Sequence, residues 1–329
     1  MTLNLLNTQP PPVDLGILVY VDHQPHALEE FGWLYKSLLF SGLFERARVI
    51  AVCHPQIAHA LPEHPGVQVI PSEPYAHTHA EWAGYGYINS VANLCAPQVL
   101  EACQDTAYLL KTDCDTFVTR ALGSFRPSGL CFGFGGYAYE EDVRRTLSAY
   151  SARYGFAHSG LHNVGASVLG PTVMVSQFLQ TQMTFCTRLL QDAFADGPGT
   201  WPGWCKAVLT MYAGELALRA TYPQQCSLGL LDHFPSGART LASDVLHIHA
   251  WHTADYWSKH DDRAGKYAHM PREAIDPSTL GGYCHYLACA SADEIAAQAG
   301  TRHARHPTQA PAGAPEINPL ENEMNASHP

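Results

Sequence analysis

Two aspartates, Asp113 and Asp115, directly follow an apolar run that begins at residue 108. In an extended strand, residues spaced i and i+2 point to the same face. Two aligned carboxylates at the end of a buried strand are costly unless a cation neutralises them. We therefore predict a site for Mg²⁺ or Mn²⁺, hard cations that prefer oxygen ligands. The alternative is that Asp113 caps a turn and Asp115 is solvated.

Histidines near residue 250 form a second candidate ligand group. His247 and His249 would share one face of a strand, and His252 lies just beyond it. Histidine is the commonest protein ligand for softer divalent metals, so one of these could complete the coordination begun by the aspartates. The chain holds 19 histidines, so any single one could equally be structural. Lys259 follows as a point charge suited to a phosphate.

Asn163 and Gly165 come just before a predicted strand. A glycine there would let a ligand approach the backbone, and an asparagine side chain offers both donor and acceptor to a polyhydroxylated substrate. An Asx turn ending in a glycine cap explains the same residues equally well.

Two further carboxylates are candidates for acid–base chemistry. Glu215 lies in a predicted helix, and Asp232 follows the strand-like run 226–231. Either could act as a base beside an acceptor, although a solvated helix carboxylate is the default interpretation of Glu215. Trp201 and Trp204 lie in a loop rich in glycine and proline, where flat aromatic faces could contact a sugar or pack as a lid.

Apolar periodicity indicates the elements that must position these residues. Short buried runs alternate with segments of helical spacing, which predicts an α/β fold with a mostly parallel central sheet flanked by helices. The strands are expected at 16–21, 48–53, 67–70, 108–112, 129–133, 167–169, 226–231 and 245–252. The first helix is expected to begin near residue 28. The later helices are expected to span 87–95, 97–103, 140–154, 172–194 and 207–220.

These elements predict one domain over residues 15–290, with an N-terminal extension at 1–14 and a disordered tail at 291–329. The first turn lacks the G-x-G-x-x-G pattern, which disfavours a dinucleotide cofactor.

Composition and charge limit the classes of partner that the protein is expected to bind. A formal net charge of −11 disfavours a nucleic-acid duplex or an anionic membrane surface. No apolar run is long enough to span a membrane, and the first residues lack the pattern of a secretory signal. The ten cysteines form no C-x-x-C pair, which is typical of free thiols in a reducing compartment. We therefore expect a cytoplasmic protein.

The order of these motifs resembles the GT-A fold nucleotide-sugar glycosyltransferases, most closely the glycogenin and bacterial galactosyltransferase group. It also resembles a poorly characterised family predicted to contain such transferases. The resemblance covers residues 16–267. It is carried, in chain order, by the Asp-x-Asp at Asp113 and Asp115, the Asn-x-Gly at Asn163 and Gly165, Glu215, the late histidines and Lys259.

The resemblance implies a single GT-A-like domain that transfers a sugar from a UDP-sugar to an acceptor. That acceptor could be a glycan, a protein or a small molecule. The aspartates and a late histidine would hold Mn²⁺ or Mg²⁺ on the donor diphosphate, and Lys259 would contact the phosphates. Asn163, Gly165 and the acidic helix residue would face the donor sugar.

Tyr20, at the end of the first strand, would contact the base. Retention of stereochemistry is favoured. The stretch from His249 to Lys259 is longer than the family pattern and lacks its glycine, so the identity of the histidine ligand stays open.

Two other functions fit the same residues. A metal-dependent hydrolase would use His247, His249 and the two aspartates around zinc or a metal pair. A non-catalytic nucleotide-sugar-binding protein would keep the metal site without transfer.

Overall fold

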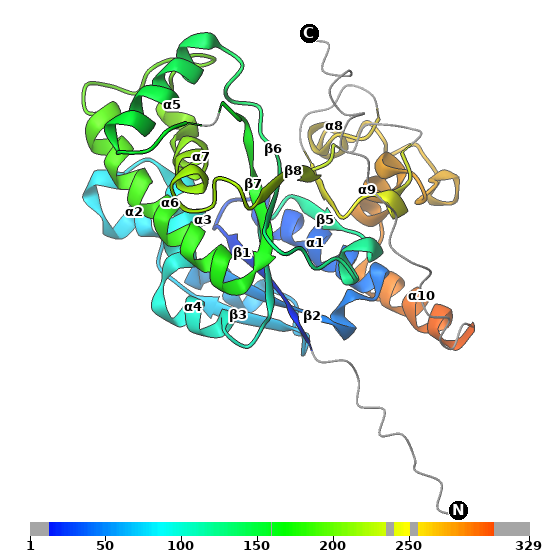
Figure 1. The fold of residues 1–329 in the computed structure, drawn as a ribbon. Helices are drawn as coiled ribbons and strands as arrows, with labels where there is room; N and C mark the ends of the chain where they lie inside the picture. The colour runs from blue at the N-terminus through cyan, green and yellow to red at the C-terminus, as the bar shows by residue number, and fades with distance from the viewer. Residues whose placement is uncertain (1–12, 159, 235–239, 251–255, 306–329) are drawn as a thin grey trace, which may run out of the picture.

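A computed structural model describes residues 13–158, 160–234, 240–250 and 256–305. Its centre is a seven-stranded sheet in the order β3-β2-β1-β4-β7-β6-β8 (Figure 1). The strands are β1 (Leu15–Val21), β2 (Ala47–Cys53), β3 (Val67–Pro71), β4 (Tyr108–Thr112), β6 (Leu130–Phe134), β7 (Val164–Pro171) and β8 (Cys226–Leu231).

The sheet is mostly parallel, as the sequence predicts. β1 pairs in parallel with β2 and β4, and β2 pairs in parallel with β3. β7 is antiparallel to both β4 and β6, while β6 and β8 are parallel. Within this sheet β7 alone therefore runs against the others, and the carboxyl ends of β4, β6 and β8 lie at one edge.

Helices cover both faces of the sheet (Figure 1). The alternation of side chains along β1 explains why both faces are apolar. Ile17 and Val19 pack with Phe31 of α1, whereas Leu18 packs on the opposite face in a cluster that includes Phe178 of α6. The helices are α1 (Ala27–Ser41), α2 (Tyr75–Thr78), α3 (Asn89–Ala92), α4 (Pro97–Cys103), α5 (Glu141–Arg153), α6 (Thr172–Ala193), α7 (Leu209–Thr221), α8 (Lys259–Arg263), α9 (Leu280–Cys289) and α10 (Ala292–Arg305).

A small second sheet lies beyond the end of β4. It pairs β5 (Thr116–Val118) antiparallel with β9 (His247–His249), with Thr116 opposite His249. Phe117 of β5 anchors this sheet in a third apolar cluster, where its ring stacks on Trp33 and meets Trp257 edge to face. Since β5 starts one residue after Asp115, this pairing brings the late histidines to the aspartates.

Three of the predicted segments differ from the structure. The predicted helix 87–95 is broken into short helical segments that include α3. The strand predicted over 245–252 is limited to β9, and residues 251–255 lie outside the described part.

The third difference is at the C-terminus, where we expected a disordered tail from residue 291. Helix α10 forms there instead, because Ile295 is buried in the third cluster, and α10 packs against α1. Residues 306–329 lie outside the described part. None of the helices among the described residues is both long and apolar enough to cross a membrane.

Candidate metal centre

The structure brings Asp113, Asp115 and His249 together at the carboxyl end of β4. One potential ligand atom from each residue lies within 4.8 Å of those from the other two. His249 Nε2 is 3.2 Å from Asp115 Oδ1. Ligand sites in open α/β sheets form beyond the carboxyl ends of strands, which is where this group lies.

Backbone bonds around the turn after β4 hold the two aspartates in place. The Thr116 hydroxyl donates to the Asp113 carbonyl at 2.8 Å, and the Ala250 N–H donates to the Asp115 carbonyl at 2.8 Å. Cys114, between the aspartates, is buried and donates its thiol to the Tyr20 carbonyl. The turn thus directs Cys114 into the protein and both carboxylates toward His249.

His249 lies between two carboxylates. Its Nδ1 is 3.5 Å from Asp232 Oδ1, and its Nε2 faces Asp115. Burial alone would lower the pKa of His249, but the charges and hydrogen bonds of these aspartates outweigh it and raise the pKa to about 10. Burial would likewise raise the pKa of Asp232, but His249 and His247 lower it to about 2. Without metal, the imidazole of His249 is therefore protonated.

Lys259 offsets the negative charge of Asp115 and of the nearby Glu30. Its Nζ donates to Asp115 Oδ2 and lies 3.4 Å from Glu30 Oε1. Burial opposes ionisation of Asp115, but His249 and Lys259 together lower its pKa. Two carboxylates and an imidazole are a ligand set that suits Mn²⁺ or Mg²⁺, and metal entry would release the proton of His249.

His247 does not join this group. It is fully buried, its Nδ1 accepts from the Asp232 N–H at 3.1 Å, and its Nε2 is 2.9 Å from Thr112 Oγ1. Burial lowers the pKa of His247 to about 4, so the ring is neutral. Both ring nitrogens are used within the protein, which corrects the prediction of His247 as a metal ligand.

Asp232 is a buried supporting residue. Its backbone has φ of 55°, and its Oδ2 accepts from the Ser167 N–H at 3.2 Å. A Cβ added at Gly133 or Gly165 would lie 2.3 or 2.4 Å from the Asp232 carboxylate, so these glycines make room for it. Asp232 therefore orients His249, and its geometry does not support the predicted role as a base beside an acceptor.

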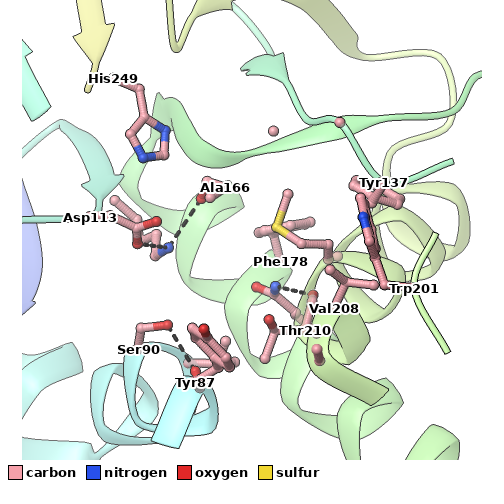
Figure 2. Close-up of a pocket in the computed structure, with 18 residues that line it drawn as sticks. Tyr87, Ser90, Asp113, Tyr137, Ala166, Phe178, Trp201, Val208, Thr210 and His249 are labelled. Carbon is pink, nitrogen blue, oxygen red and sulfur yellow. Dashed lines mark hydrogen bonds and ion pairs between the residues drawn. The ribbon is translucent and has the colours of Figure 1, made fainter. Parts of the chain in front are cut away.

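A cavity of about 620 Å³ opens beside this candidate metal centre. Figure 2 shows Asp113 and His249 on one side of it, with Tyr137 and Trp201 on the opposite side. Gly165 also lines the cavity, as its predicted contact with a donor requires. A cavity of this volume is typical of small-molecule sites.

Lys111 is a cavity residue that our reading of the sequence missed. Its ammonium is buried and donates to Asp113 Oδ1 at 3.0 Å and to the Ala166 carbonyl at 3.1 Å. The available signal was its position two residues before Asp113 in β4, because that spacing places both side chains on one face of the strand.

Asn163 shapes the loop before α5. It has φ of 61°, and its Oδ1 accepts from the backbone N–H groups of Tyr137 and Ala138 at 3.0 and 2.6 Å. The side-chain oxygen is therefore engaged by backbone, as in the Asx-turn alternative. Asn163 positions Tyr137 at the cavity and is not itself a lining residue.

Glu215 is the centre of a closed polar cluster. Its Oε1 accepts from His158 Nε2 at 2.7 Å and His162 Nδ1 at 2.8 Å, and its Oε2 accepts from the Tyr137 hydroxyl at 2.7 Å. Burial would raise its pKa, but these three bonds lower it. Glu215 is fully buried and does not line the cavity, so its geometry does not support contact with a sugar or acceptor.

Of the remaining predicted site residues, some line the cavity and others do not. Trp201 is half exposed and lines the cavity, whereas the ring of Trp204 is stacked between other aromatic rings, including that of Tyr212 at 4.1 Å. Tyr20 is a core residue whose hydroxyl has no hydrogen-bond partner within the described chain, and it does not line the cavity. His252 falls outside the described residues.

A family model for a domain of unknown function, DUF7164, matches residues 51–295. The chain belongs to this family. The matched segment contains every residue of the candidate metal centre, together with Lys111 and Lys259. No curated protein matches the chain.

Proposed function

We propose that the protein is a metal-dependent glycosyltransferase of GT-A-like type that uses a nucleotide sugar, in first place a UDP-sugar. The observation that carries the proposal is the convergence of Asp113, Asp115 and His249 at the edge of the cavity, with a lysine beside each aspartate. A divalent metal held by these ligands, together with the two lysine ammonium groups, would offer the positive charge that a diphosphate needs.

Asp113, Asp115 and His249 would hold Mn²⁺ or Mg²⁺. When bound, the metal would act as a Lewis acid that stabilises the negative charge developing on the leaving diphosphate. Lys111 and Lys259 would add positive charge at the same place, because each already pairs with one aspartate. A phosphate arriving here would compete for these ammonium groups and form charge-assisted hydrogen bonds.

The rest of the cavity would hold the sugar and the acceptor. Tyr87 and Trp201 expose large aromatic faces there, and Gln182 and Thr210 add polar groups. The only carboxylate among the lining residues is that of Asp113. Since Asp113 is assigned to the metal, the described cavity supplies no separate carboxylate base, which supports retention of stereochemistry.

Binding of a nucleotide sugar is the first test. Purified protein is heated with a panel of nucleotide sugars, with Mn²⁺ and with chelator. We expect UDP-sugars to raise the melting temperature only with metal, because a ligand at 100 times its Kd stabilises the folded state by about 2.7 kcal/mol. Asp115→Asn should lose this response, while the exposed surface variant Asp105→Asn should keep it. No shift with any nucleotide sugar would overturn the proposal.

Turnover then separates the alternatives. A transferase releases UDP when a member of a glycan, peptide and small-molecule acceptor panel is supplied. A hydrolase would turn over without acceptor and would retain zinc that is lost from Asp115→Asn. Metal-dependent binding with no UDP release in either condition would identify a binding protein.

A further inference from the structure

A second cluster of possible ligands lies between helices α8 and α9, away from the cavity. It consists of Asp262 on α8 and His285 and Cys289 on α9. One potential ligand atom from each residue lies within 4.8 Å of those from the other two. We propose that these three residues form a second metal site, selective for Zn²⁺ rather than for Mn²⁺ or Mg²⁺.

His285 provides the independent observation. Its side chain is fully buried, and its Nδ1 lies 2.7 Å from the Tyr256 hydroxyl. Its Nε2 has no hydrogen-bond partner within the described chain. Buried ring nitrogens are rarely left unpaired, which indicates that His285 Nε2 binds a ligand. In metal sites the second nitrogen of a histidine is typically fixed by a hydrogen bond, which is the part that Tyr256 would play.

Helix geometry brings the other ligands to His285. His285 and Cys289 are spaced i and i+4 on α9, which places them one above the other on one face. Cys289 is exposed, so a metal ion can reach the site from solvent. Lys36 and Arg272 donate to the carbonyls of Ala288, Cys289 and Ala290, which fixes the end of α9 that carries Cys289.

The donor types select the metal. A thiolate, an imidazole and a carboxylate together suit Zn²⁺, whereas Mn²⁺ and Mg²⁺ prefer oxygen ligands such as those of the first centre. On binding, the thiol of Cys289 gives its proton to solvent and its sulfur becomes a ligand. The thiolate and the Asp262 carboxylate would then balance the two charges of the metal, and a fourth position would remain for water.

The position of the cluster gives it a consequence for the first centre. Asp262 lies three residues after Lys259 on α8, and Lys259 pairs with Asp115. A metal bound by Asp262, His285 and Cys289 would cross-link α8 to α9. This cross-link would hold α8, and with it Lys259, in position beside Asp115.

Cobalt is the probe that tests this site, because Co²⁺ replaces Zn²⁺ and its bond to a thiolate gives a charge-transfer absorption band. The full chain is stripped of metal and titrated with Co²⁺. We expect the band to saturate at one equivalent and to be displaced by one equivalent of Zn²⁺. Cys289→Ser should abolish it, and Asp262→Asn should weaken Co²⁺ binding at least about tenfold, as for loss of a metal-associated group.

Two matched controls define the site. Cys226→Ser, at a half-buried cysteine of β8, should keep the band, and so should Asp115→Asn. Because Asp115→Asn removes only the first centre, the result is independent of the proposed transferase. Zinc should also protect Cys289, and not Cys226, from alkylation detected by mass spectrometry. A stripped protein that shows no thiolate band, or a band that survives in Cys289→Ser, would overturn the proposal.

Discussion

The candidate metal centre of Asp113, Asp115 and His249 and the Glu215 cluster contain the same kinds of residue, yet they differ in their access to the cavity. Each combines histidine and carboxylate side chains whose atoms lie within 4.8 Å of one another. Around Glu215, both carboxylate oxygens accept hydrogen bonds from protein donors, and the network is closed. At the first centre, Asp113 and His249 line an open cavity. Access to a cavity, more than residue type, distinguishes a ligand site from a structural clamp.

Replacing the central carboxylate of each region gives the largest contrast in metal binding. Asp115→Asn should weaken Mn²⁺ binding by at least about 100-fold, the upper range for loss of a group that supports a metal site. Glu215→Gln should leave Mn²⁺ affinity unchanged, because Glu215 does not reach the centre. Isothermal titration calorimetry with Mn²⁺ measures both. Equal losses in the two variants would remove the distinction.

Stability should show the reverse order. Glu215→Ala deletes a buried acceptor that receives hydrogen bonds from three side chains, so we expect a loss of about 3 kcal/mol in the free energy of unfolding. The exposed Glu101→Ala serves as the matched control and should change stability by less than about 0.5 kcal/mol. Urea denaturation gives both values. A Glu215→Ala variant as stable as the control would show that the cluster is not a clamp.

The two histidines of β9 sharpen the comparison within the centre itself. His249→Ala should weaken Mn²⁺ binding by about 10–100-fold. It should also lower stability without metal, because Asp115 and Asp232 lose the positive charge that lies between them. His247→Ala should lower stability by roughly 1–3 kcal/mol without the loss of Mn²⁺ affinity, because it empties a fully buried position and leaves the Asp232 N–H without its acceptor. Calorimetry measures the Mn²⁺ affinity of both variants, and urea denaturation measures their stability. Stronger loss of metal affinity in His247→Ala would reverse our assignment.

These histidines also show how far the sequence alone could lead. The apolar run before Asp113 and the i, i+2 spacing predicted a carboxylate pair at the end of a sheet strand, because both signals are local. The same period of two places His247 and His249 on one face, so it cannot choose between them. Contacts with Thr112 and Asp232, distant in sequence, make that choice.

The role of Glu215 and the choice between the two interpretations of Asn163 could not be predicted for a similar reason. Their partners, His158 and His162 for Glu215 and the Tyr137 and Ala138 N–H groups for Asn163, come from other segments of the chain. Periodicity indicates which face of an element is buried, but not which polar groups meet there. The α/β class was predictable because it depends on the alternation of whole elements.

Lys111 tests whether the cavity side of the centre handles phosphate. Lys111→Met retains most of the side-chain volume in a buried position and removes the charge that pairs with Asp113. We expect the Kd for UDP in the presence of Mn²⁺ to rise about tenfold, the equivalent of one charge-assisted hydrogen bond. Lys206→Met, at the edge of α7, is the control and should bind UDP normally. An unchanged Kd in Lys111→Met would place the phosphates elsewhere.

The smallest effect is expected at Trp201, on the side of the cavity opposite the aspartates (Figure 2). Its side chain is 52% exposed, so Trp201→Ala should hardly change the free energy of unfolding. If Trp201 contacts the sugar or acceptor, as its position suggests, the variant should raise KM for an acceptor several-fold and leave Mn²⁺ and UDP affinities unchanged. Trp204→Ala is the informative counterpart. Trp204 is half-buried and stacked on Phe194 and Tyr212, so its loss should cost roughly 2–3 kcal/mol of stability. The two tryptophans of one loop would then separate into a binding residue and a packing residue.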